Sequence, residues 1–426
     1  MLNKKYALSL FLLSAISVET KAADFVYQSD IILAHYDNLN LENQPSESDS
    51  SYEVGMGLRV LEDTSNLLAS INLDVSYIDY KNNVASDTAN GQLYSRVVWR
   101  IKPEVFDWVL VDNFTQSVID PLDSSAPDNR QNINVLSTGP DYNIRINSNN
   151  NLRLEGRFEK YNYENGIDND RLFSAMRWVH DFNSYVTLSI NNEAEVTKFE
   201  NDDTNPKTRR NDFFLSSNYS RGLTSVDAEY GITQIKDDST RDLDSDRYLF
   251  SITSTRTRTS VVTLTYEKLL SDTGNEVQRI DPSQQLIGNV LGSVANDVFV
   301  TERYYIEYVK NLTVGELNID LSIEDISYDQ LTILNESSES AYINLIWNLP
   351  RGNNIIINAN NRKTLFDDPA TNREDIDRSY SAAFLYNLNR NINVNIEAIS
   401  LSRDSSIIAE SYDDFRVLLS LRYASH

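Results

Sequence analysis

The chain contains no cysteine and only three histidines among its 426 residues. Disulfides are therefore excluded, and a zinc or haem site has almost no available ligands, so we expect no metal and no cofactor. After residue 23 no run of 18 apolar residues occurs, which excludes a bundle of membrane-spanning helices. No stretch keeps the 3.6-residue period of an amphipathic helix. The pattern that is present is a two-residue alternation.

The first 22 residues differ from the rest of the chain. Lys4 and Lys5 precede an apolar stretch over 6–18, and a site of small residues ends at Ala22. These are the three zones of a secretory signal peptide, so we expect a signal peptide over 1–22 and a single β domain over 23–426. The chain has 63 acidic and 38 basic residues, and without the leader's three lysines and one glutamate its charge is −27. Such an acidic chain repels nucleic acid, which we exclude as a partner.

Alternation of apolar and polar residues runs through the whole of 23–426. In "NLLASINLDVSYIDY" (66–80) the odd positions from Leu67 to Tyr77 are apolar, while the middle even positions are polar. This period predicts a strand with one apolar and one wet face. About 20 such segments of roughly 10–14 residues occur; they lie near 25–36, 52–61, 67–79, 91–102, 105–116, 132–146, 151–163, 171–180, 185–198, 210–220, 223–235, 246–256, 261–270, 299–310, 314–328, 340–349, 355–363, 378–388, 391–402 and 412–424.

Short and long connections alternate between these segments. Short ones include 147–150 and 389–391, and long ones include 117–131 and 271–298. The pattern predicts an all-β protein, a transmembrane antiparallel up-and-down β-barrel of about 20 strands (18–22 possible), with short periplasmic turns and long extracellular loops. Its apolar face would meet lipid in the outer membrane of a Gram-negative bacterium, and its wet face would line a water-filled lumen. Pro140 alone of nine prolines falls inside a strand, which predicts a bulge there.

The four tryptophans share the parity of the apolar face. Trp99, Trp108, Trp178 and Trp347 each fall near a short connection. We interpret them as a periplasmic aromatic belt, because an amphipathic ring prefers the membrane interface. The alternative is that aromatic residues simply favour strands.

Six arginines fall on neighbouring strands, mostly on the polar face: Arg96, Arg100, Arg145, Arg153, Arg157 and Arg177. Clustered in this way they would form a basic stripe inside an acidic protein. One hypothesis is a track for an anionic polymer, since guanidinium groups bind carboxylates and phosphates. The other is internal pairing with Asp141, Glu155 and Glu159, which would give a salt-bridged wall.

Signals for catalysis are weak, and we expect no enzyme activity. No nucleophile-elbow, zinc-protease or phosphate-loop motif is present. His35 lies near the predicted outer rim beside Asp37, but a rim histidine is more often a solvated strand-end residue than a base. The acidic loops at 200–205, 236–246 and 373–378 either bind divalent cations bridging lipopolysaccharide or are simply solvated. The loop at 271–298 holds an apolar patch that could enter the lumen as a plug.

Two stretches carry a resemblance to a known family: "YDNLNL" (36–41) and "DPLDSSAPDNRQNINVLSTGP" (120–140). With the leader and the length, they resemble the outer-membrane β-barrel porins associated with exopolysaccharide secretion, including the exosortase-associated barrels. The carboxyl-terminal "FRVLLSLRY" likewise resembles the signal read by the barrel assembly machinery.

The family resemblance implies a polar conduit for export of an anionic or neutral exopolysaccharide, working with a polysaccharide export protein. The other expected partners are outer-membrane lipid and lipopolysaccharide. Two alternatives stay open: a general or small-solute uptake porin, and a plugged structural or adhesive barrel.

Overall fold

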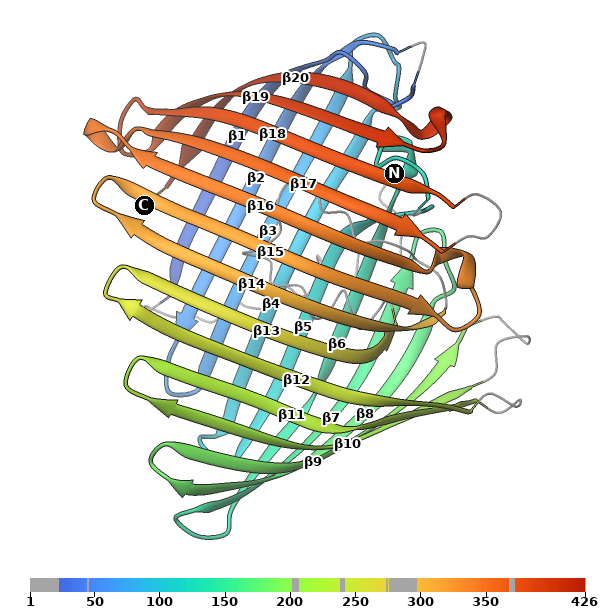
Figure 1. Cartoon of the computed structure of the whole chain (residues 1–426). Coiled ribbons are helices and arrows are strands. Elements are labelled where there is room, and N and C mark those ends of the chain that lie inside the picture. Colours follow the sequence, from blue (N-terminus) through green and yellow to red (C-terminus); the bar gives the residue numbers. More distant parts are fainter. Residues whose placement is uncertain are drawn as a thin grey trace.

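The structure, a computed structural model, is one closed sheet of twenty antiparallel strands (Figure 1). It describes residues 23–43, 46–120, 122–200, 207–237, 242–272, 275, 297–367 and 372–425. The expected signal peptide lies outside these residues. So do most of the 271–298 loop and parts of the acidic loops at 200–205 and 236–246.

Every predicted strand is present, and each hydrogen-bonds to its sequence neighbours. The strands are β1 (Asp24–Tyr36), β2 (Asp49–Asp63), β3 (Leu67–Tyr80), β4 (Thr88–Lys102), β5 (Phe106–Val118), β6 (Arg130–Arg145), β7 (Asn150–Tyr163), β8 (Asn169–Asn183), β9 (Val186–Phe199), β10 (Thr208–Arg221), β11 (Thr224–Asp237), β12 (Asp242–Thr257), β13 (Ser260–Asp272), β14 (Val298–Leu312), β15 (Gly315–Tyr328), β16 (Glu336–Asn348), β17 (Asn354–Phe366), β18 (Glu374–Asn387), β19 (Ile392–Ser405) and β20 (Tyr412–Ala424). Short 3-10 turns are η1 (Pro127–Asn129), η2 (Thr332–Leu334), η3 (Pro350–Gly352) and η4 (Ile408–Glu410).

The barrel closes where β1 pairs with β20, from Gln28 opposite Ala424 to Tyr36 opposite Arg416. The connections after even-numbered strands are two to five residues long and share one end of the barrel with the carboxyl terminus, at the left in Figure 1. We call this the turn end. The connections after odd-numbered strands are four to 25 residues long and define the loop end. The predicted up-and-down topology is confirmed.

The strands are longer than the alternation predicts, at 13–16 residues each. Most of the extra residues lie at the loop end; β2, for example, begins at Asp49 rather than near residue 52. The pattern stops earlier than the strand because beyond the lipid both faces of the sheet meet polar surroundings, while the backbone ladder continues.

The bulge predicted at Pro140 is wrong. Pro140 sits opposite Trp108 on β5 with no shift in register. On the other side, the β6–β7 ladder omits Gly139 and Pro140 and resumes in the same register at Asp141 opposite Glu155. Proline lacks an N–H group, so two residues of β6 lose their pairing with β7. No extra residue is inserted, as a bulge would require.

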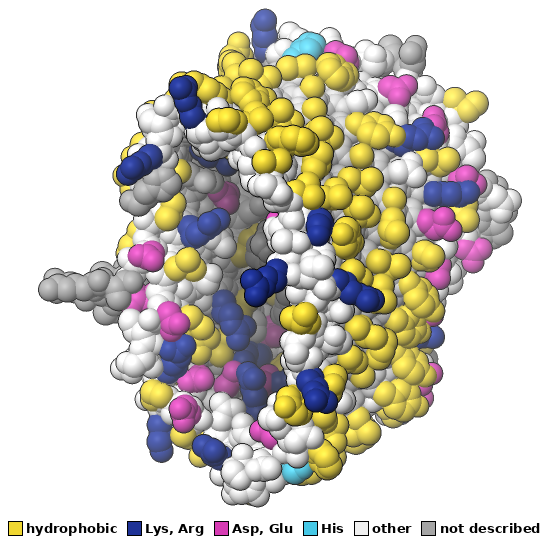
Figure 2. Space-filling view, turned by 60° about the vertical axis from the view of Figure 1, so that its left-hand side comes forward, with side chains coloured by type: hydrophobic (Ala, Val, Ile, Leu, Met, Phe, Trp, Pro, Cys, Tyr) yellow, Lys and Arg dark blue, Asp and Glu magenta, His cyan; other side chains and the backbone are white. Residues whose placement is uncertain are grey.

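The two faces of the sheet divide by parity. The outer face carries exposed apolar side chains, such as Met56 at 66% and Leu172 at 63% exposure, and they form a continuous surface in Figure 2. Figure 2 also shows that the barrel is hollow at the turn end, where Lys and Arg side chains line the interior. A closed sheet with lipid-compatible walls leaves no unpaired edge, so the chain is a transmembrane barrel of the outer membrane. No helix within the described ranges has the length and apolar character needed to cross a membrane.

Candidate functional site in the lumen

In the sector β15–β18 of the lumen wall, neutral polar side chains of β16–β18 form a hydrogen-bonded cluster beside the carboxylates of β15. Asn358 accepts hydrogen bonds from the Tyr342 hydroxyl at 3.0 Å and from Asn344 at 2.6 Å, and it donates to Ser381 Oγ at 3.0 Å. These bonds run strand to strand because directly opposite residues on one face lie within side-chain reach. We call this sector the amide wall.

The opposite sector, β5–β8, lies ten strands away in the ring of twenty and is charged. Arg153 bonds with Asp141 at 3.2 Å and with Glu155 at 2.7 Å, and Arg157 also bonds with Asp141. Arg177 bonds with Glu155, and with Glu193 of β9 at 2.6 Å. We call this sector the paired wall. Its arginines neutralise carboxylates of their own sheet, which favours the salt-bridged hypothesis for these three residues.

The remaining members of the basic stripe behave differently. Arg100 reaches the end of β2 and pairs with Asp63 at 3.1 Å. Arg96 and Arg145 are exposed on the lumen side and have no ion pair in the part of the chain that the structure describes. The six arginines therefore do not form one continuous free track.

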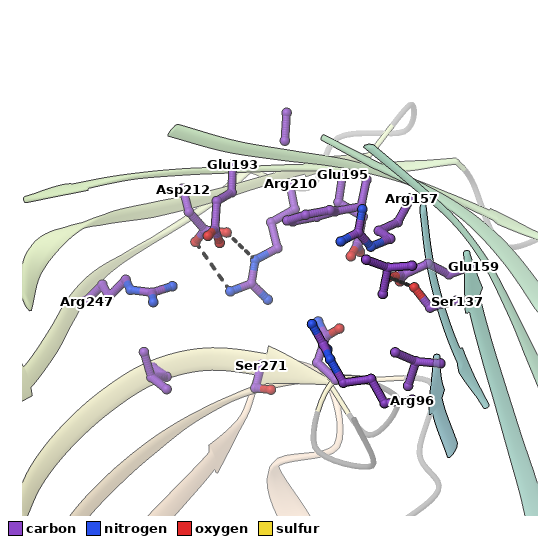
Figure 3. A pocket seen from close by; sticks show the side chains of 16 residues that line it. Arg96, Ser137, Arg157, Glu159, Glu193, Glu195, Arg210, Asp212, Arg247 and Ser271 are labelled. Atoms are coloured by element: carbon purple, nitrogen blue, oxygen red, sulfur yellow. Dashed lines mark hydrogen bonds and ion pairs between the residues drawn. The ribbon is translucent and has the colours of Figure 1, made fainter. Parts of the chain in front are cut away.

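A cavity of about 400 Å³ opens between the paired wall and β9–β13. Four arginines line it, Arg96, Arg157, Arg210 and Arg247, together with four carboxylates, Glu159, Glu193, Glu195 and Asp212. Figure 3 shows Arg96, Arg210 and Arg247 pointing into this space. Arg210 is held by Asp212 at 2.8 Å and Arg247 by Glu229 at 2.8 Å, whereas Arg96 is unpaired within the described residues. The cavity is thus suited to a small polar solute or one sugar unit.

Arg171 ties distant parts of the loop end together. Its guanidinium is 4% exposed, stacks 3.9 Å over the Tyr161 ring and bonds with Glu195 of β9 at 3.3 Å. It also makes a two-pronged contact with Asp272 at 2.9 and 3.1 Å. Asp272 ends β13, five strands from β8, so this ion pair reaches across the lumen between two strands that are not neighbours. Sequence reasoning missed it because nothing local links two positions a hundred residues apart.

Part of the loop end is covered by ordered loop residues. Asn38 is 2% exposed; its N–H donates to Asp414 Oδ1 at 2.9 Å, and its amide donates to Glu42 O at 2.7 Å. The turn that Asn38 organises buries Leu39 against Tyr80 of β3. The segment 37–43 therefore folds back onto the barrel.

The second covering segment is 122–129. The Asn129 amide donates to Asp120 O and to Ser124 O, both at 2.8 Å. Ser124 Oγ then donates to Asn40 O at 3.4 Å, and Arg373 at the start of β18 donates to Leu122 O. The two stretches that carry the family resemblance thus meet at the loop end. We call segments 37–43 and 122–129 together the loop-end cover.

The four tryptophans lie near the turn end on the outer face, between 40% and 58% exposed. Trp99 and Trp108 are direct cross-strand partners. Trp178 stacks on His180, with ring centroids 6.0 Å apart. A belt at this interface stays a prediction.

His35 has neighbours of the kind that hydrolases use. Its Nδ1 lies 3.0 Å from Ser50 Oγ and its Nε2 lies 3.4 Å from Asp37 Oδ1. The Ser50 N–H, which could stabilise an oxyanion, instead donates to Asp49 at 2.7 Å. Within the part of the chain that the structure describes, the group is a cross-strand pair at the rim without an N–H donor placed as an oxyanion hole requires.

The acidic segment 373–378 offers no open cation site. Asp375 pairs with Arg373 at 2.8 Å, and Asp377 pairs with Arg403 at 2.7 Å. Among the described residues, no group of three or more His, Asp or Glu side chains is arranged to hold a metal ion.

No family model matches the chain, and no curated protein matches it by sequence. Solved structures do match. A variant of the ferric enterobactin receptor PfeA from Pseudomonas aeruginosa aligns with 95% of this chain and 81% of its own, at 9% identity and a TM-score of 0.50. OpdQ of the same organism aligns with 96% of this chain and 100% of its own, at 10% identity and a TM-score of 0.44. At 9% identity the likeness to the PfeA variant shows the fold alone, that of an outer-membrane β-barrel.

Proposed function

We propose that the barrel is a passive conduit that carries a hydrophilic polymer, an exopolysaccharide, outward through the outer membrane. The observation that carries the proposal is the two-sided lumen, in which a wall of amides and hydroxyls faces a wall of paired charges. Amides and hydroxyls exchange hydrogen bonds with sugar hydroxyls, and guanidinium–carboxylate walls stay hydrated. Such a lumen lowers the barrier for a hydrated chain without binding it tightly.

The loop-end cover fits the same proposal. It joins the two stretches that resemble the exopolysaccharide-associated barrels, and it rests on backbone and side-chain bonds that a passing polymer could displace. The driving force would come from polymer synthesis and from a polysaccharide export protein in the periplasm. We assign no chemical step to the barrel.

Deleting the gene in its host tests this function. We expect loss of surface polysaccharide with retention of polymer in the periplasm, measured by sugar analysis of both fractions. The purified barrel should conduct ions in a planar bilayer. Unchanged surface polysaccharide would refute export, and a barrel that never conducts would refute a conduit of any kind.

A second candidate is a small-solute porin. The cavity of about 400 Å³, lined by four arginines and four carboxylates, favours it, because it has room for one small polar molecule. Liposome swelling separates the two: a porin admits monosaccharides and amino acids rapidly, and its deletion leaves surface polysaccharide unchanged.

A further inference from the structure

The inward-facing arginines of the barrel fall into two groups. Those held by carboxylates occur at both ends, as in Arg171 with Asp272 and Arg403 with Asp377 toward the loop end, and Arg100 with Asp63 and Arg153 with Asp141 toward the turn end. Toward the turn end, four others have no ion pair in the ranges that the structure describes: Arg59, Arg96, Arg145 and Arg422. We call these four the vestibule arginines.

The vestibule arginines occupy one sector of the wall. They lie on β2, β4, β6 and β20, the even-numbered strands around the barrel closure, and each is in the half of its strand nearest the turn end. All four have inward parity, and all four side chains are exposed. Figure 2, which looks toward the turn end, shows Lys and Arg side chains inside the hollow.

Carboxylates of the same sector lie against the wall. A Cβ built on Gly55 would be 2.5 Å from Asp30 Oδ2, and one on Gly57 would be 2.5 Å from Asp74 Oδ1. Each carboxylate therefore occupies the space that a side chain at the neighbouring glycine position would fill. Asp74 in addition accepts a hydrogen bond from Gln28 at 2.9 Å. Neither carboxylate bonds with a vestibule arginine.

Across the lumen the turn end carries acidic side chains of inward parity, among them Asp227 of β11 and Glu316 of β15. They bond with the amides of Asn218 at 2.6 Å and Asn318 at 3.2 Å rather than with cations. The two sides of the entrance therefore differ. On the closure side, exposed guanidinium groups without an ion pair among the described residues lie in the same sector as the wall-bound carboxylates Asp30 and Asp74, whereas Asp227 and Glu316 lie on the other side. An anionic chain entering it is attracted to the first side and repelled from the second.

We propose that the vestibule arginines form an entry site for the carboxylates of an acidic, uronate-containing polysaccharide arriving from the periplasm. The inference rests on the proposed conduit function and specifies its cargo and its side of entry. Guanidinium forks match carboxylate geometry, and their placement on alternate strands spreads the contacts along a chain instead of concentrating them at one point. Hydrated contacts of this kind are individually weak, so the chain is captured and still moves on.

The test is current block in planar bilayers with a galacturonate hexamer, and with maltohexaose as the neutral probe. With the hexamer added at the turn end, Arg59→Gln, Arg96→Gln, Arg145→Gln and Arg422→Gln combined should weaken block by about ten-fold. The same variant should lower anion-over-cation permeability, and maltohexaose should show no change. Block by the wild-type barrel should also fall as salt rises, because screening weakens exposed charge pairs.

The matched control replaces four turn-end arginines outside the lumen wall: Arg221→Gln, Arg256→Gln, Arg258→Gln and Arg351→Gln. They are exposed, and none forms an ion pair within the described residues. Block should stay at the wild-type level. Equal weakening in both quadruple variants, or none in the vestibule variant, would overturn the proposal.

Failure of the conduit function is distinguishable from failure of the entry site. A wild-type barrel that conducts nothing would refute the conduit function. The entry site is then tested separately, by titration calorimetry of hexamer binding to the detergent-solubilised barrel. Wild-type binding that the vestibule variant loses supports the site; equal binding by the two refutes it.

Discussion

At the residue scale, single polar side chains decide how the loop end is ordered. Asp49 is 1% exposed, and its carboxylate accepts backbone N–H bonds from Ser50 at 2.7 Å, Asn82 at 2.9 Å and Val84 at 3.1 Å. Asp297 does the same for Gln330 and Leu331. One carboxylate therefore satisfies donors that a turn between strands leaves unpaired.

Replacing Asp49 by alanine removes these three acceptors. Because hydrogen bonds to a charged group are worth about 1.5–3 kcal/mol each, we expect the local opening free energy of 81–87 to fall by at least about 2 kcal/mol. Hydrogen exchange at Asn82 and Val84 measures this directly. Asp63→Ala is the control, since Asp63 is exposed and pairs with Arg100; an equal change in both variants would contradict the assignment.

Arg171 shows the energetic importance of a buried ion pair. With Arg171→Gln, the Asp272 and Glu195 carboxylates lose their guanidinium partner at a site that is mostly buried. We expect the unfolding free energy to fall by about 3 kcal/mol. It is measured by urea titration in detergent, with the folded fraction read from the different gel mobilities of the folded and unfolded barrel. Lys236→Gln, which removes an exposed pair with Asp242, should leave the unfolding midpoint close to the wild-type value.

At the element scale, the lapse in the β6–β7 ladder is the feature that the strand pattern could not specify. Pro140 was visible as an exception in the sequence, but the accommodation depends on the partner strand. A Cβ on Gly139 would lie 2.1 Å from Gly156 O, so the two backbones approach too closely for any side chain. Glycine at 139 is thus needed by the pairing, not by a turn.

Gly139→Ala should force β6 and β7 apart and cost about 1–3 kcal/mol of stability, as other overpacking substitutions do. The control is Gly156→Ala, where the new Cβ would meet only Pro140 atoms at 3.8 Å, an ordinary contact. Urea unfolding of the two variants in the same detergent provides the comparison. Similar midpoints for both would show that the approach of Gly156 O does not exclude a side chain at position 139.

At the scale of the whole molecule, twenty strands enclose a lumen whose sectors differ. The amide wall and the paired wall face each other, the vestibule arginines lie near the closure, and the loop-end cover joins loops from β1–β2 and β5–β6. A conduit for a charged polymer benefits from walls of different chemistry, because one surface hydrates the polymer while another attracts it. On the proposed conduit function, passage would require local displacement of the residues of the loop-end cover.

Linking Asn40→Cys to Ser124→Cys tests the loop-end cover. The two segments are in contact, since Ser124 Oγ lies 3.4 Å from Asn40 O, and mild oxidation of the double variant followed by a count of free thiols identifies the population in which a disulfide joins them. The oxidised barrel should export less polymer than the reduced one, since the two loops can no longer separate. Polymer at the cell surface, compared with and without reductant, measures the effect. Full export by the oxidised form would show that the cover does not obstruct passage.

Sequence alone determined the architecture, because period-2 alternation, connection lengths and proline positions are local properties that the membrane enforces on every strand. It also placed the four tryptophans on the apolar face. Tertiary structure decided which arginines are free. Arg153, Arg157 and Arg177 share a face with carboxylates of adjacent strands, whereas Arg59 and Arg422 join Arg96 and Arg145 only because the barrel closes between β1 and β20. Pairing depends on shear and register around the whole ring, and no local pattern encodes those quantities.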